Sequence, residues 1–330
     1  MALINILMAS YKGGEHLPAQ LDSILGQTFQ DFAVYIRDDA SPDNTVDIID
    51  FYAQNYPGKI RAIKNNIPSG SAKNNFFKLI EYPDYDGEYF MFCDQDDFWL
   101  PEKNQITLDE MRRAEAQTGK DKPILIHTDL EVVNQNLQTT ARSFMKYQGL
   151  KPKQKSLSNL LVQNNITGCT VMVNRTLLEL ARLKCAEQTE TRHHSGESSD
   201  LPQDAVIMHD GWLGLIAAAM GEIRFVDRQT IKYRQHGSNE VGAKNIYDLK
   251  YIMSQIKIKL RKKEKYASTC AQARLFYDIF GDRLDDQRRE LLEKYISLPK
   301  KNKIGRWYYV IRYGFWMQGF SRKIAQLIFG

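Results

Sequence analysis

The chain alternates short apolar runs with amphipathic stretches over its first 130 residues. Runs rich in β-branched and aromatic residues predict strands, whereas stretches whose apolar side chains recur every three or four residues predict helices. Strands are predicted at 3–8, 32–37, 60–64, 89–93 and 124–127, and helices at 17–25, 46–53, 72–81 and 102–115. Because strands alternate with helices, the pattern favours an α/β fold with a doubly wound, mostly parallel sheet that binds ligands at the carboxyl ends of its strands.

The alternation loosens beyond residue 130. Further strands are predicted at 170–174 and within 223–233, and further helices at 176–184 and 211–220. Residues 187–204 are polar and nearly free of apolar side chains, which indicates a mobile loop. From residue 243 onward only helical stretches are predicted, at 251–260, 267–280 and 284–296. The chain is therefore expected to contain an α/β domain over 1–242 and a helical C-terminal region over 243–330.

The distribution of charge distinguishes these two regions. Hydrophobic residues make up 43% and charged residues 26% of the 330 residues, which is ordinary globular usage and excludes a disordered chain. The net charge is +5, but residues 1–250 carry −6 and residues 251–330 carry +11. Such a basic region is attracted to phosphate-rich surfaces, either nucleic acid or an anionic membrane.

Cysteines and the amino terminus indicate the compartment. The four cysteines are far apart and form no CxxC pair, so neither a zinc knuckle nor a disulfide scaffold is predicted, and a reducing cytoplasm fits best. The first residues lack a basic stretch and are interpreted as a core strand instead of a signal peptide. The longest apolar run, 212–220, is about half of the ~20 residues that a bilayer crossing needs.

Acidic residues follow two of the predicted strands. The strand at 89–93 is followed by Asp94, Gln95, Asp96 and Asp97. Clustered carboxylates raise one another's proton affinity unless a cation neutralises them, and oxygen ligands suit Mg²⁺ or Mn²⁺ bridging to phosphates. Capping of a following helix would explain one of the acids but not three.

The strand at 32–37 likewise ends in Asp38 and Asp39. Taken alone, this pair is explained equally well by capping of the next helix. Together with the later acidic segment, it would line one crevice of the sheet with acceptors for a nucleotide base and ribose.

These motifs, in their order, resemble a known family. MASY after the first strand, DDAS after the second and DQDD after a later one are similar to the inverting glycosyltransferases of family 2, which have the GT-A fold. The resemblance covers roughly residues 1–240. Further on, NNITGCTVMVNRTLLEL, HDGW and YRQHGSNEVG resemble the rhamnosyltransferase-type branch of that family.

The resemblance implies roles for individual residues. Asp210, in HDGW, is implied as the catalytic base that takes the proton of the acceptor hydroxyl, although it also lies where a helix cap is expected. Asp96 is implied as the direct metal ligand, with His236 facing the diphosphate or the metal. The implied nucleotide-sugar-binding residues are Ala9, Tyr11, Asp38, Asp39, Lys73, Asp94, Gln95 and His236. Among these, Tyr11 and Asp39 would contact the base, Lys73 the base or the phosphates, and Asp94 the ribose.

The C-terminal region indicates a further binding partner, a membrane surface. Basic clusters at 257–265 and 300–306 precede aromatic residues that continue to residue 329, a combination that suits the interface of an anionic bilayer. Packing of these aromatics on the catalytic domain is the alternative. Nucleic acid is not expected as a partner, because no recognised binding motif accompanies the charge and the acidic body would oppose a polyanion.

The sequence therefore predicts a metal-dependent inverting glycosyltransferase that uses Mn²⁺ or Mg²⁺. The expected donor is dTDP-L-rhamnose, or otherwise a UDP-hexose, and the expected acceptor is a lipid-linked bacterial cell-surface polysaccharide. The protein is expected in the cytoplasm, peripheral on the inner face of the plasma membrane. Two alternatives remain open: a sugar nucleotidyltransferase, and a non-catalytic glycan-binding protein docked on the membrane.

Overall fold

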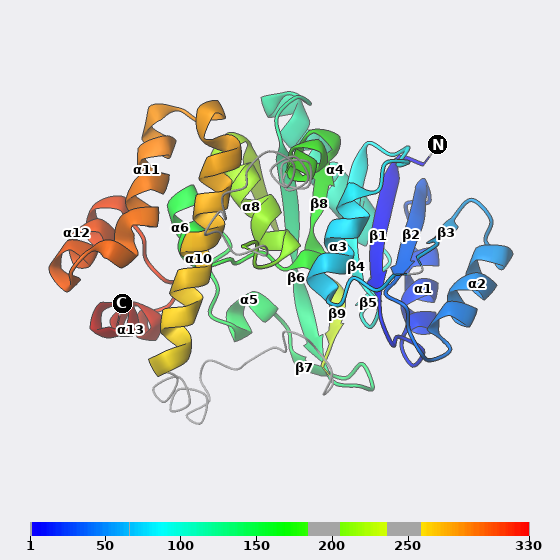
Figure 1. Cartoon of the computed structure of the whole chain (residues 1–330). Coiled ribbons are helices and arrows are strands. Elements are labelled where there is room, and N and C mark those ends of the chain that lie inside the picture. Colours follow the sequence, from blue (N-terminus) through cyan, green and yellow to red (C-terminus); the bar gives the residue numbers. More distant parts are fainter. Residues whose placement is uncertain (1, 66, 184–204, 236–258, 330) are drawn as a thin grey trace. The chain divides into compact units, whose positions relative to one another are not determined.

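The computed structural model describes residues 2–65, 67–183, 205–235 and 259–329 (Figure 1). Contacts between residues divide the chain into two compact units. The first, here called the sheet unit, comprises Met1–Phe144, Ile166–Arg182 and Glu222–Ala243. The second, the helical unit, comprises Met145–Asn165, Leu183–Gly221 and Lys244–Gly330. This division is discontinuous along the chain, and the functional boundary expected at residue 242 stays a prediction.

A nine-stranded sheet forms the sheet unit, in the order β3-β2-β1-β4-β8-β6-β9-β5, with β7 paired to β6. The pairs β3–β2, β2–β1, β1–β4 and β6–β9 are parallel, and β8 runs antiparallel between β4 and β6. The strands are β1 (Ile4–Ser10), β2 (Phe32–Asp38), β3 (Ile60–Ile63), β4 (Tyr89–Asp94), β5 (Phe98–Trp99), β6 (Ile124–Val133), β7 (Thr139–Ala141), β8 (Met172–Asn174) and β9 (Glu222–Arg234). The predicted α/β fold with a mostly parallel sheet is confirmed.

The parallel half of the sheet is buried as its sequence requires. Every residue of β1 is buried, which is typical of a parallel strand covered on both faces. The helices of this unit are α1 (Leu17–Leu25), α2 (Thr45–Asn55), α3 (Ala72–Glu81), α4 (Lys103–Thr118) and a helix over residues 175–183. In α1 the spacing of Leu17, Leu21 and Ile24 places all three on the buried face. The side chain of Ser71 caps α3 by accepting from the Asn74 N–H.

Helices alone build the described part of the second unit. They are α6 (Leu157–Val162), α8 (His209–Met220), α10 (Lys259–Phe280), α11 (Asp286–Ser297), α12 (Lys303–Tyr313) and α13 (Phe320–Phe329), and the short α5 (Phe144–Tyr147) lies at the border of the units. Wholly buried Trp212 of α8 packs edge-on against Phe276 of α10, with ring centroids 5.5 Å apart. Tyr295 of α11 donates to the Leu161 carbonyl at 2.8 Å. The predicted C-terminal helical region is confirmed, and no helix within the described ranges is both long and apolar enough to span a bilayer.

Candidate active site

The carboxyl ends of β1, β2 and β4 lie together at one edge of the sheet. In the parallel register Ser10 pairs with Asp38, and Ala9 pairs with Asp94. Three of the predicted site residues, Ala9, Asp38 and Asp94, are therefore adjacent although they are far apart in sequence. Because β1 has the neighbours β2 and β4 on its two sides, this edge is the point at which ligands bind in doubly wound sheets.

Asp38 joins two of these strand ends. Its carboxylate accepts from the Ser10 hydroxyl at 2.8 Å, from the Ser41 N–H at 2.7 Å and from the Ser41 hydroxyl at 2.6 Å. A carboxylate has about four lone-pair positions, so three of them serve the chain itself. Asp38 therefore shapes the loop after β2, and the turn that it holds gives Ala40 a positive φ of 59°.

Asp39 is 5% exposed and forms a buried ion pair with Arg37. It accepts from the Arg37 Nη1 at 2.9 Å, the Ser69 N–H at 2.6 Å and the Gly70 N–H at 2.9 Å. Burial acts to raise the pKa of Asp39, but the hydrogen bonds from Ser69, Arg37 and Gly70 outweigh it and hold the pKa below its ordinary value. Asp39 is thus charged at neutral pH, and it fastens the loop before α3 to the sheet.

Lys73 lies in the first turn of α3, three residues after Gly70. The hydrogen bonds of Asp39 therefore also determine where the start of α3 lies. The side chain of Lys73 is half-buried. Lys73, the predicted cation, therefore lies just after the segment that is hydrogen-bonded to Asp39 at the carboxyl edge of the sheet.

Tyr11 and Gln95 are held together by two hydrogen bonds. The Tyr11 N–H donates to Gln95 Oε1, and Gln95 Nε2 donates to the Tyr11 carbonyl, both at 2.8 Å. Gly13 permits this contact, because a Cβ there would lie 2.4 Å from Gln95 Oε1. The Tyr11 ring is 49% exposed, with the Lys12 ammonium 5.1 Å from its centre. An exposed ring at this edge is able to stack on a nucleotide base.

The acidic segment after β4 is fixed by Arg234 at the end of β9. The Arg234 Nε donates to the Asp96 carbonyl at 2.9 Å, and its N–H donates to Asp97 Oδ1 at 3.4 Å. Asp94 and Asp96 are half-buried, whereas Asp97 is wholly buried. Burial, with Asp96 and Asp94 nearby, raises the pKa of Asp97 well above its ordinary value.

Beneath this segment lies a buried ammonium that the sequence analysis missed. Lys103 is 0% exposed, and its Nζ lies 4.5 Å from the centre of the Trp99 ring. Burial lowers the pKa of Lys103 to about 8, opposed by Cys169, Cys93 and Asp97. A signal was present, because Lys103 is four residues before Thr107 and eight before Met111, which places it on the buried face of α4.

The carboxylates fit a divalent cation. Asp94, Asp97 and Cys169 each offer a ligand atom, and these atoms lie within 4.8 Å of one another. Oδ2 of Asp97 has no hydrogen-bond partner among the described residues, and a cation would compensate this buried oxygen. Burial and the nearby carboxylates raise the pKa of the Cys169 thiol well above its ordinary value. Because a protonated thiol is a poor metal ligand, the carboxylate oxygens would be the main ligands of a hard cation. Asp96, the predicted ligand, is not in this group and adjoins it in sequence.

Asp210 belongs to the helical unit, in the first turn of α8. Its Oδ1 accepts from the Gly211 N–H at 2.6 Å, and a negative charge is favourable at a helix amino terminus. The N-cap position is Met208, so the carboxylate lies two residues beyond it. Burial lowers the pKa of the adjacent His209 to about 3, which keeps that imidazole neutral at pH 7. His236, the polar loop at 187–204 and residues 251–258 of the helix predicted at 251–260 lie outside the described residues.

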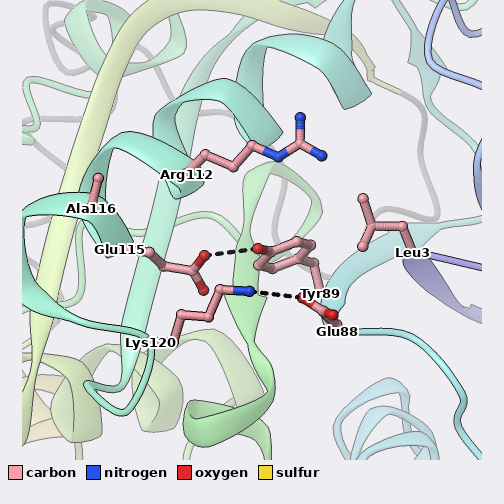
Figure 2. Close-up of a pocket in the computed structure, with 7 residues that line it drawn as sticks. All are labelled: Leu3, Glu88, Tyr89, Arg112, Glu115, Ala116 and Lys120. Atoms are coloured by element: carbon pink, nitrogen blue, oxygen red, sulfur yellow. Dashed lines mark hydrogen bonds and ion pairs between the residues drawn. The ribbon is translucent and has the colours of Figure 1, made fainter.

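A depression of about 520 Å³ lies at the other end of β4 (Figure 2). Figure 2 shows Tyr89, the first residue of β4, donating to Glu115 at 2.7 Å, and Lys120 beside Glu88 at 3.4 Å. The depression is lined by two acidic and two basic side chains. Their charges cancel, so the depression has no net charge that would attract an ion. Because Tyr89 and Asp94 are opposite ends of one strand, roughly 17 Å apart, this depression is separate from the candidate site.

Comparison with known proteins identifies the family of the chain. Residues 5–175 match the model of glycosyl transferase family 2. The chain is 27% identical over 247 residues to the dTDP-rhamnosyl transferase RfbG of Shigella flexneri, covering 74% of this chain and 76% of that protein. It is 34% identical over 118 residues to the UDP-Glc:alpha-D-GlcNAc-diphosphoundecaprenol beta-1,3-glucosyltransferase WfaP of Escherichia coli, covering 34% of this chain and 44% of that protein.

Solved structures share the architecture. The S. aureus TarS 1-349 structure has a TM-score of 0.52 at 13% sequence identity, and the match covers 89% of this chain and 70% of that chain. This likeness confirms the predicted GT-A fold. The similarity to RfbG confirms the resemblance to the rhamnosyltransferase-type branch. Since the family model matches more than half of the sequence, the chain belongs to glycosyl transferase family 2 and is a glycosyltransferase.

Proposed function

We propose that this glycosyltransferase moves L-rhamnose from dTDP-L-rhamnose to a lipid-linked bacterial cell-surface polysaccharide, with a UDP-hexose as the alternative donor. The observation that carries the proposal is the meeting of Ala9, Asp38 and Asp94 at the carboxyl edge of the sheet, in a chain similar to RfbG. Membership of family 2 favours sugar transfer over the nucleotidyltransferase and glycan-binding alternatives.

Different residues at this edge would contact the base, the ribose and the phosphates of the nucleotide. The exposed Tyr11 ring would stack on the base, and Asp39, whose carboxylate is charged at neutral pH, would accept from it. Asp94 would accept from the ribose hydroxyls, while Gln95 keeps the Tyr11 backbone in place. Lys73, on the segment fastened by Asp39, would meet the base or the phosphates.

The acidic segment would hold Mn²⁺ or Mg²⁺, with Asp96 as a direct ligand beside Asp94 and Asp97, and with His236 facing the diphosphate. When bound, the ion would supply positive charge for the departing nucleoside diphosphate. The side chain and backbone of Arg234 keep the acidic segment in position for this.

Asp210 would act as the base. As the acceptor oxygen bonds to the anomeric carbon, its proton passes to the Asp210 carboxylate and the bond from that carbon to the phosphate oxygen breaks. The electron pair of the broken bond leaves with the nucleoside diphosphate, so one displacement inverts the configuration. The hydrogen bond from the Gly211 N–H orients the carboxylate for this role.

The acceptor indicates where the protein works. The name of WfaP states an acceptor attached to diphosphoundecaprenol, which is a lipid carrier. If the acceptor of this chain is lipid-linked as well, the protein would act peripherally on the cytoplasmic face of the plasma membrane.

The test compares Asp210→Asn and Asp96→Ala with wild type, using dTDP-L-rhamnose and UDP-glucose with and without Mn²⁺. Asp210→Asn should lower transfer by about 10²- to 10⁴-fold while donor binding, measured by calorimetry, is retained. Asp96→Ala should lose the Mn²⁺-dependent part of donor binding. Asp47→Asn is the matched control, because Asp47 also lies in the first turn of a helix and is exposed. Full transfer by either site variant would overturn its assignment, and release of pyrophosphate would indicate a nucleotidyltransferase.

A further inference from the structure

Helix α12 turns its apolar stripe toward solvent. Ile304, Trp307, Tyr308 and Ile311 are 77%, 40%, 60% and 65% exposed. Their spacing of three, four and seven residues places them on one face, the arrangement that a surface helix ordinarily buries. The buried residue of α12 is Val310, which lies outside this stripe on the helix surface.

Positive charge borders this stripe on both sides. At 100° per residue, Lys303 falls beside Trp307 on the helix surface and Arg312 falls beside Tyr308, and both cations are exposed. The Lys303 ammonium lies 5.3 Å from the centre of the Trp307 ring. Residues 294–330 contain eight Lys or Arg and no Asp or Glu. A protein surface with opposite charge or an anionic lipid surface would complement this pattern.

The polar group of Trp307 is already satisfied. Its Nε1 donates to the Leu327 carbonyl of α13 at 3.0 Å, and α12 and α13 are neighbours at the periphery of the helical unit (Figure 1). The ring is therefore held in place and can enter an apolar layer without exposing an unpaired N–H to it.

Other aromatics of the C-terminal region do pack on their own unit. Phe315 is wholly buried and packs edge-on against Tyr295, with ring centroids 5.0 Å apart. Both interpretations of the C-terminal aromatics thus apply to different residues. Among the described residues of this region, the exposed large apolar side chains are the four of the α12 stripe and Ile324 of α13, which is 42% exposed.

The size and the composition of the stripe favour lipid over protein. A standard protein interface engages about 20–30 residues on each side, whereas this stripe has four apolar side chains. Trp and Tyr with flanking Lys and Arg are the residues that settle in the interfacial layer of a bilayer, where apolar side chains meet acyl chains and cations meet phosphates.

We propose that α12 docks the protein on an anionic membrane, lying in the plane of the interface. Ile304, Trp307, Tyr308 and Ile311 enter the boundary of the acyl chains, and Lys303 and Arg312 bind the lipid phosphates on either side. Docking is separate from sugar transfer, since it needs neither donor nor metal. It would hold the enzyme at the layer in which a lipid-linked acceptor lies.

Flotation of the 330-residue chain with vesicles, without nucleotide sugar, tests the proposal. Wild type should bind phosphatidylcholine vesicles that contain about 30% phosphatidylglycerol and bind pure phosphatidylcholine weakly. The double substitution Ile304→Ser, Ile311→Ser should weaken binding at least about tenfold, because two exposed side chains no longer insert. Lys303→Gln and Arg312→Gln should each weaken vesicle binding about fivefold. The effect of each substitution should be smaller in high salt, which screens the attraction to the lipid phosphates.

The control carries the same kind of change on another exposed apolar surface. Val46 and Phe51 of α2 are 43% and 60% exposed, so Val46→Ser, Phe51→Ser should leave vesicle binding unchanged. Quenching of tryptophan fluorescence by brominated lipid should occur in wild type and be largely lost in Trp307→Phe.

Equal binding by the Ile304→Ser, Ile311→Ser variant and wild type would overturn the proposal. So would a dimer in solution that this variant abolishes while vesicle binding persists, because the stripe would then be a protein interface. Failure of docking is distinguishable from failure of the proposed function, because a water-soluble acceptor reports transfer without any membrane. The docking variant should transfer to that acceptor at the wild-type rate.

Discussion

The substitution Asp39→Asn should destabilise the sheet unit strongly although it changes a single functional group. Asp39 accepts hydrogen bonds from the Arg37 guanidinium and from the Ser69 and Gly70 N–H groups. Asparagine offers one acceptor oxygen, so its amide NH₂ must face at least one of these donors. The Arg37 side chain, 8% exposed, also loses its counter-charge. Removing one partner of such a buried pair costs about 3–5 kcal/mol.

Hydrogen exchange of the β2 amides, followed by mass spectrometry, measures this loss locally. Because each 1.36 kcal/mol is a factor of ten, protection should fall by roughly 10²- to 10⁴-fold. Asp50→Asn, at an exposed position of α2, is the control and should leave protection unchanged. The double variant Arg37→Met, Asp39→Asn should lose less than the sum of the two single losses, since neither charge is then buried alone.

The same reasoning predicts a dependence on pH. A carboxylate with a lowered folded pKa stabilises the fold above its unfolded pKa of about 3.9 and loses that contribution as the pH falls through the folded value. The difference between wild type and Asp39→Asn should therefore be constant near neutrality and shrink below about pH 4. A loss of protection under about threefold at pH 7, or strictly additive single losses, would refute the role assigned to this pair.

Two further predictions concern the two buried cores. Trp212→Ala should destabilise the helical unit by about 3–5 kcal/mol, measured by urea unfolding, because it leaves a cavity beside two phenylalanine rings; a loss below about 1 kcal/mol would contradict that packing. Wild type should gain stability relative to Lys103→Met as the pH rises from about 8 to about 10, because the unfolded chain, with the ordinary lysine pKa, binds the proton more tightly over that range. A difference in urea midpoint that is independent of pH would show that the Lys103 ammonium is not perturbed by burial.

Much of the sheet was predictable from local pattern. The runs at 89–93 and 32–37 are apolar and β-branched or aromatic, and the acids that follow them mark the carboxyl ends of β4 and β2. Parallel pairing then places Asp94 and Asp38 at one edge, as the structure shows. The two-residue β5 and the three-residue β7 were not predicted, because neither belongs to an apolar run long enough to indicate a strand.

The chemistry beneath the acidic segment was less accessible. Cys169 comes to Asp97 from 72 residues further along the chain, a proximity that no local pattern contains. The place of Asp210 in the helical unit likewise depends on contacts between separate segments. For α12, the spacing of the apolar residues was readable, but their exposure to solvent followed only from the tertiary structure. Local propensity thus located the strand ends, and long-range packing decided what surrounds them.

The paired hydrogen bonds between Gln95 and the Tyr11 backbone constrain how this site can evolve. Since Gln95 occupies the space where residue 13 would carry a Cβ, these positions are free to change only together. Among relatives, a side chain larger than glycine at position 13 should accompany a side chain shorter than glutamine at position 95. An attempt to redesign the donor preference through Tyr11 would therefore have to vary positions 11, 13 and 95 together.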